Sequence, residues 1–107
     1  MPTYNKLVRD LIPDMIRAQG KYLKTEILDE AAYRTELRKK LEEEHQEYAN
    51  SKLDDEAVEE LADMLEVIYA LASLHGSSEE HLNHVRKMKA DKRGGFKERI
   101  YLVEADE

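Results

Sequence analysis

Side chains suited to a packed face recur at helical spacing along most of the chain and predict three long helices. In the first, from about Asp29 to Asn50, they lie three or four residues apart, at Tyr33, Leu37, Leu41, His45 and Tyr48. A second helix is expected from Asp54 to Gly76, with Asp54 as N-cap and a hydrophobic staple between Leu53 and Val58. A third should begin at a Ser77–Glu80 capping box and stop at Gly94-Gly95.

The two ends of the chain carry weaker patterns. Residues 10–20 predict a short helix with Pro13 in its first turn and Gly20 after its end. Residues 22–28 and 96–104 are rich in β-favouring residues and partly alternate, so we expect a small two-stranded antiparallel element there. The predicted fold is mainly all-α: an antiparallel helical bundle forming a single domain over residues 1–107.

Acidic residues interrupt the most apolar part of the chain. Residues 61–74 are apolar almost all round, yet Asp63 lies among them, and a buried carboxylate is costly unless it is paired or binds a metal. Glu60 and Asp63 are three residues apart and share a helix face, as do Glu44 and Glu47 on the preceding helix. The two pairs are equally far from the short interhelical loop, so in an antiparallel hairpin all four carboxylates should converge.

Four converging carboxylates repel one another unless cations neutralise them. The chain has no Cys, and its His residues do not cluster with these acids, so a metal site here would have oxygen ligands only. Such ligation favours Mg²⁺ or Mn²⁺ over Zn²⁺. Glu42 and Glu43 fit a solvated helix face, whereas Glu66 suits either a further ligand or a structural salt bridge.

Composition narrows the function classes. Hydrophobic residues make up 41% and charged residues 38% of the chain, and the net charge is -7. An acidic chain is poorly suited to general binding of nucleic acid or of an anionic membrane. Neither a membrane-spanning run nor a signal-peptide pattern is present, and a cytoplasmic location is therefore expected.

Four stretches together resemble a known family. "EEEHQEY" followed by "EELADMLEVIYAL" resembles the E-x-x-E … E-x-x-D signature of the MazG-like all-α nucleoside triphosphate pyrophosphohydrolases, and "KADKRGGF" and "YNKLVRDLIPDMI" resemble a house-cleaning subfamily. The resemblance implies that Glu44, Glu47, Glu60 and Asp63 are catalytic Mg²⁺ ligands. It also implies hydrolysis of a nucleoside triphosphate to a monophosphate and pyrophosphate.

Basic and polar residues then become candidates for substrate binding. Lys89 and Arg93 share a face at the end of the third helix and suit phosphate oxygens, although a helix C-terminus favours cations in any case. Asn83 lies on the same helix. Lys6 and Arg9, three residues apart in the opening motif, are candidates to reach the active site of the same or a neighbouring subunit.

The sequence leaves two alternative functions open and also predicts an oligomer. The carboxylates alone do not exclude a phosphoribosyl-ATP pyrophosphohydrolase, and a non-catalytic helical dimerisation or regulatory module is a different class. The second long helix is too apolar for one neighbour to cover, which indicates a homodimer or homotetramer, as the resemblance also does. We expect Met64, Ile68 and Leu71 at or near that contact.

Overall fold

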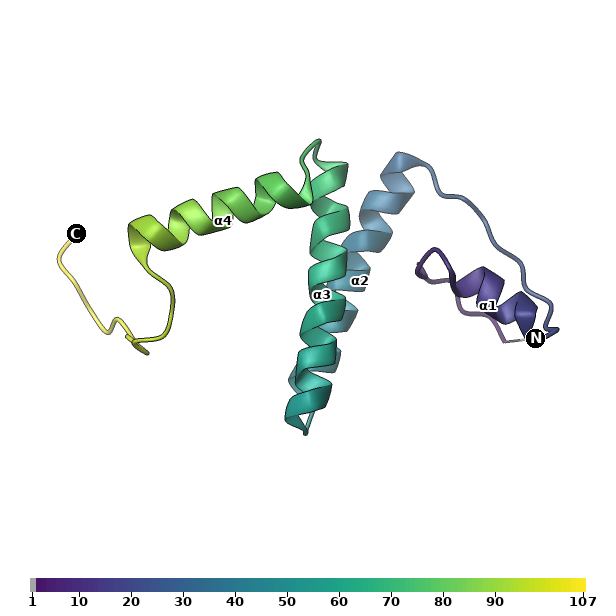
Figure 1. Ribbon diagram of the computed structural model, residues 1–107, viewed down its shortest axis with the longest axis horizontal. Coiled ribbons are helices and arrows are strands. Elements are labelled where there is room, and N and C mark those ends of the chain that lie inside the picture. Colours follow the sequence, from purple (N-terminus) through teal and green to yellow (C-terminus); the bar gives the residue numbers. More distant parts are fainter. Residues whose placement is uncertain (1) are drawn as a thin grey trace.

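The chain folds into helices joined by irregular segments. The computed structural model describes residues 2–107 and contains α1 (Ile12–Ala18), α2 (Glu30–Asn50), α3 (Asp54–Leu74) and α4 (Glu79–Arg93). The predicted all-helical class is confirmed. Figure 1 shows α2 and α3 side by side as an antiparallel hairpin, with α1 standing on one side of it and α4 extending from the other.

Local signals place the helix ends. The Asp29 side chain caps α2 by accepting a hydrogen bond from the Ala32 backbone N–H at 2.8 Å. Pro13 lies in the first turn of α1, as predicted. Two N-cap predictions were one residue off: Leu53 precedes α3, and the Ser78 side chain, in place of Ser77, caps α4 by accepting from the His81 N–H at 3.0 Å.

The end of α3 is a tight reversal that redirects the chain into α4. Gly76 has φ 76°, a left-handed conformation that glycine adopts without a steric penalty. The Ser77 N–H donates to the Ala72 carbonyl at 2.9 Å, and the Gly76 N–H donates to the Ser73 carbonyl at 3.0 Å. These two bonds form a Schellman motif, which satisfies carbonyls that the helix end leaves free.

The predicted two-stranded β element is not present among residues 2–107. Residues 22–28 lie beside α1, whereas residues 96–104 follow α4 at the opposite end of the molecule (Figure 1). Strands are stabilised by interstrand hydrogen bonds and cross-strand contacts, so a β-favouring segment without an adjacent partner forms no ladder. Both segments carry the alternating pattern, but they do not pair with each other.

The apolar core of the single chain is very small. Leu37 on α2 and Val67 on α3 are the only buried hydrophobic side chains among the described residues. The Cα radius of gyration is 18.2 Å, whereas a compact chain of this length would have about 13 Å. Most of the apolar surface is therefore left outside the hairpin seam.

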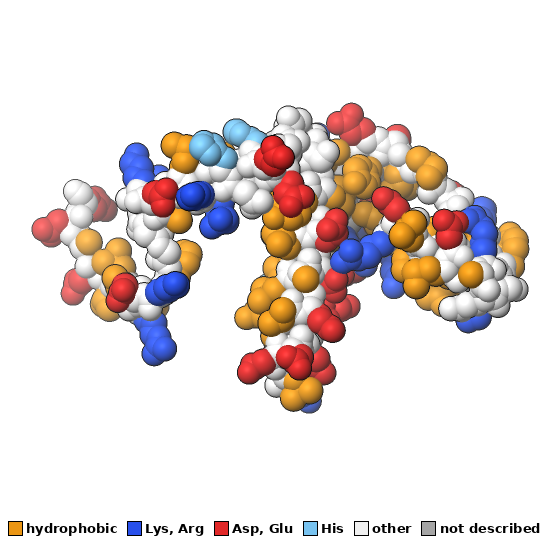
Figure 2. Space-filling model, viewed as in Figure 1, with side chains coloured by type: hydrophobic (Ala, Val, Ile, Leu, Met, Phe, Trp, Pro, Cys, Tyr) orange, Lys and Arg blue, Asp and Glu red, His pale blue; other side chains and the backbone are white. Residues whose placement is uncertain are grey.

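Part of this exposed apolar surface follows one flank of α3. Val58, Leu61 and Leu65 are spaced to share a helix face, and each is exposed. Figure 2 shows apolar side chains along this flank and acidic side chains along the other flank of the hairpin. Met64, Ile68 and Leu71 are half-buried. No helix in the described part of the chain has the length and apolar character needed to cross a membrane.

Candidate carboxylate site

Three glutamates meet in the seam between α2 and α3. Carboxylate oxygens of Glu44, Glu47 and Glu60 all lie within 4.8 Å of one another. Glu44 and Glu47 come from α2 and Glu60 from α3, so the convergence depends on the hairpin register that the sequence predicted. Glu44 is the most deeply placed of the three, with only 7% of its surface exposed.

The fourth predicted ligand is held outside this group. Asp63 lies one turn further along α3, and its Oδ1 accepts a hydrogen bond from Arg9 Nη2 at 2.8 Å. Both side chains are substantially exposed, 58% for Arg9 and 40% for Asp63. An ion pair this exposed contributes about 0–1 kcal/mol to stability. Asp63 is thus available to exchange partners at low cost.

A second cation pairs with another acid of the cluster. Lys40 Nζ lies 3.6 Å from Glu44 Oε1 and 3.9 Å from Glu43 Oε2. The sequence placed Lys40 near the exposed acids of α2, and its pairing with Glu43 agrees with that; its pairing with Glu44 was not predicted, although i,i+4 is the usual spacing of a helical ion pair. The carboxylates therefore have two cationic neighbours, Lys40 beside Glu44 and Arg9 beside Asp63.

The central carboxylate holds its proton unusually tightly. The pKa of Glu60 is raised from 4.5 to about 7, first by burial, then by a hydrogen bond with Glu47 and by the negative charges of Glu47, Asp63 and Glu44. A hydrogen bond between two carboxyl groups needs a proton on one of them. In the absence of a metal, that proton reduces the repulsion between α2 and α3.

The residues present fit a hard divalent cation. Glu44 Oε2 and Glu60 Oε2 are buried and have no hydrogen-bond partner within the described chain. Buried polar atoms normally have one, so two unpartnered carboxylate oxygens in one seam mark a place suited to a cation. Oxygen donors from several carboxylates are what Mg²⁺ and Mn²⁺ prefer.

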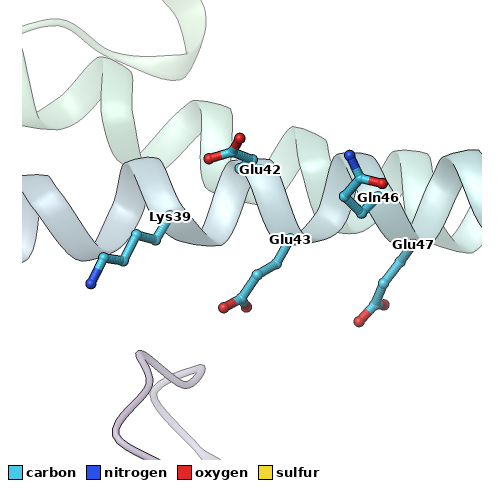
Figure 3. Close-up of a pocket in the computed structure, with 5 residues that line it drawn as sticks. All are labelled: Lys39, Glu42, Glu43, Gln46 and Glu47. Carbon is cyan, nitrogen blue, oxygen red and sulfur yellow. The ribbon is translucent and has the colours of Figure 1, made fainter.

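An open hollow of about 530 Å³ lies on the flank of α2 next to this seam. Figure 3 shows its lining side chains, all from α2: Lys39, Glu42, Glu43, Gln46 and Glu47. Glu43 and Glu47 point to the same side of the helix, whereas Glu42 points away from them. Because carboxylates outnumber the one lysine, this surface repels an anionic ligand unless a cation lies between them.

The structure does not bring the other predicted residues to the carboxylates. Lys89 and Arg93 lie towards the far end of α4, which contacts α3 alone among the helices and leads away from the seam (Figure 1). Asn83 exchanges hydrogen bonds with the Tyr69 hydroxyl at 3.2 and 3.4 Å, which ties α4 to α3. The Lys6 ammonium lies over the Tyr4 ring, 5.7 Å from its centre. Of the five predicted substrate-binding residues, only Arg9 pairs with one of the four acids.

The fold and the site define an all-helical protein with a candidate carboxylate metal centre. Comparison of the chain with protein-family models, with curated proteins and with solved structures gives no match. The chemistry of the site is therefore the basis for a functional proposal.

The raised pKa of Glu60 predicts how stability depends on pH without metal. Below about pH 4.5 the carboxyl is protonated in both the folded and the unfolded chain. Between about pH 4.5 and about pH 7 the folded chain keeps a proton that the unfolded chain releases, so the free energy of unfolding should fall as the pH rises through this window. Urea denaturation at several pH values in EDTA, at one protein concentration, measures the slope.

Glu60→Gln should flatten this slope, because glutamine does not titrate. Glu59→Gln is the matched control, since Glu59 is an exposed neighbour on α3 outside the cluster and should leave the slope unchanged. Equal slopes in the Glu60→Gln variant and the wild type would show that Glu60 does not carry the effect.

Proposed function

We propose that the protein is a Mg²⁺-dependent nucleotide pyrophosphohydrolase that cleaves a nucleoside triphosphate into a monophosphate and pyrophosphate. The observation that carries the proposal is the meeting of Glu44, Glu47 and Glu60 in the seam, with two buried oxygens that lack partners. The resemblance of the E-x-x-E and E-x-x-D stretches to the MazG-like enzymes supplies the reaction.

Each carboxylate has a distinct part in this proposal. Glu44 and Glu60 would hold the cation with their unpartnered oxygens, and Glu47 and Asp63 would complete its ligands from the exposed side of the seam. A divalent cation bound there supplies neutralisation of the triphosphate charge and activation of a water molecule. A carboxylate that is not fully used as a ligand is suited to accept the proton of the attacking water.

Cation binding and proton release should be linked. Burial and negative neighbours raise the pKa of Glu60 to about 7 in the metal-free protein, and a metal ligand must be deprotonated. Glu60 therefore gives up its proton as the cation takes its place. This linkage also explains why acidic groups in an apolar helix need not weaken the folded protein.

We also propose that the chain assembles with copies of itself, as a homodimer or a homotetramer. Its accessible surface is 9980 Å², whereas a compact monomer of 12.5 kDa would expose about 6,200 Å². The excess is larger than the roughly 800 Å² that each partner buries in a standard interface, and obligate interfaces are the larger ones. The flank of Val58, Leu61 and Leu65 on α3 is the best candidate for the contact.

The test of the reaction is pyrophosphate release from a panel of canonical and modified nucleoside triphosphates. With millimolar Mg²⁺ we expect at least one to yield pyrophosphate and a monophosphate in equal amounts, and EDTA should abolish the release. Phosphoribosyl-ATP belongs in the panel, because preferential cleavage of it would favour that alternative. No turnover on any substrate would favour a non-catalytic module.

Glu47→Gln and Asp63→Asn should each lower turnover about 100-fold or more, because each removes an anionic oxygen from the ligand set at almost unchanged shape. Both variants should stay folded, and the metal-free Glu47→Gln protein should be at least as stable as wild type because it loses a repulsive charge. Glu42→Gln, on the same helix but outside the cluster, is the control. Wild-type turnover in either variant would refute its assignment as a ligand.

Sedimentation velocity at micromolar concentration tests the assembly. We expect a mass of two or four chains for the wild type and dissociation or loss of folding for Leu61→Lys, which places a charge in the centre of the apolar flank. Leu11→Lys, an equally drastic change at an exposed residue of the N-terminal segment, should keep the assembly. A folded wild-type monomer would contradict the proposal.

A further inference from the structure

The first part of the chain is attached to the hairpin by one polar contact. Residues 2–28, here called the N-terminal arm, include α1, which contacts no other helix. Among the hydrogen bonds and ion pairs of residues 2–107, the only one that joins the arm to the remainder of the chain is Arg9–Asp63 at 2.8 Å. Figure 1 shows α1 set apart from α2 and α3.

Arg9 contacts only one of the four acids Glu44, Glu47, Glu60 and Asp63, here called the carboxylate quartet. Glu44, Glu47 and Glu60 have oxygens within 4.8 Å of one another, and Asp63 is the acid left out of that group. It is also the acid that Arg9 holds. Lys40 pairs with Glu44 from the same helix, so among residues 2–107 Arg9 is the only cation that pairs with the quartet from outside the hairpin.

We propose that Arg9 is an exchangeable counter-ion of the site: it neutralises Asp63 without a metal and transfers to a phosphate oxygen of the substrate when Asp63 becomes a metal ligand. The inference rests on the proposed function for the identity of the substrate. It goes beyond that function by assigning the N-terminal arm a role in the change from the metal-free site to the metal-bound site.

The charges and the exposure of the pair support such an exchange. Arg9 and Asp63 are 58% and 40% exposed, so the bond between them breaks without uncovering a buried charge. A cation bound beside Asp63 repels the guanidinium and competes with it for the same carboxylate. Residues 10–28 still connect the released guanidinium to α2, which keeps its effective concentration near the seam high, and its planar fork suits two oxygens of a phosphate group.

The exchange predicts opposite effects of one substitution on two ligands. Arg9→Gln should tighten binding of Mg²⁺ alone by about threefold, because the competitor for Asp63 is gone. The same substitution should weaken binding of inorganic tripolyphosphate to the Mg²⁺-saturated protein by about tenfold, because a charge-assisted contact to phosphate is lost. Isothermal titration calorimetry measures both constants, and neither depends on turnover.

Arg17→Gln is the matched control. Arg17 lies in the same arm, is 56% exposed and pairs locally with Asp14, so its removal changes the net charge equally without touching the quartet. It should leave both constants unchanged. Arg9→Lys, which keeps the charge but loses the fork, should restore most of the wild-type Mg²⁺ affinity and only part of the tripolyphosphate affinity.

Opposite shifts for Arg9→Gln would support the exchange, whereas unchanged constants or shifts in the same direction would overturn it. If Arg9 had a purely structural role, Arg9→Gln would weaken the binding of Mg²⁺ and of tripolyphosphate together. If the wild type binds Mg²⁺ and tripolyphosphate but hydrolyses no nucleotide, the proposed reaction fails while the two constants still decide the role of Arg9. If hydrolysis occurs and the constants do not move apart, only the exchange is refuted.

Discussion

Burial of carboxylates in the seam between α2 and α3 is the constraint on which the rest of the molecule depends. Glu44 is almost fully buried in the hairpin, and Glu60 has an oxygen with no partner there. Ionised carboxylates in such a place must be neutralised or they separate the helices. The chain meets this requirement with Lys40 beside Glu44, a proton on the Glu47–Glu60 pair, and Arg9 beside Asp63.

This constraint is one reason for the small core; another is that α1 packs on no other helix and α4 packs only on α3. Side chains that would otherwise fill the hairpin seam with hydrocarbon are acids, and only Leu37 and Val67 are buried apolar residues among those described. Burial of so little apolar surface cannot offset the loss of chain entropy for a domain of this length. The self-assembly and the cation binding that we propose would each add stability from outside the single chain, because partners that bind only the folded state stabilise it.

Balance by exchangeable groups also connects stability with chemistry. Without a metal, a proton, Lys40 and Arg9 each supply positive charge beside the carboxylates. A bound cation would supply positive charge in their place. The acids that weaken the hairpin when uncompensated are the ones that form the candidate metal site. A sequence selected for stability alone would place apolar residues at Glu44 and Glu60.

The sequence by itself determined the helices to within about one residue at most ends, because caps, glycine stops and periodicity act over a single turn. It also determined that Glu44, Glu47 and Glu60 meet, because a short loop between two helices sets their register. Only the tertiary structure decided that Asp63 pairs with Arg9, that α4 leads away from the acids, and that residues 22–28 and 96–104 lie too far apart to pair. Those outcomes depend on contacts between segments distant in the chain, and no local pattern encodes where such segments meet.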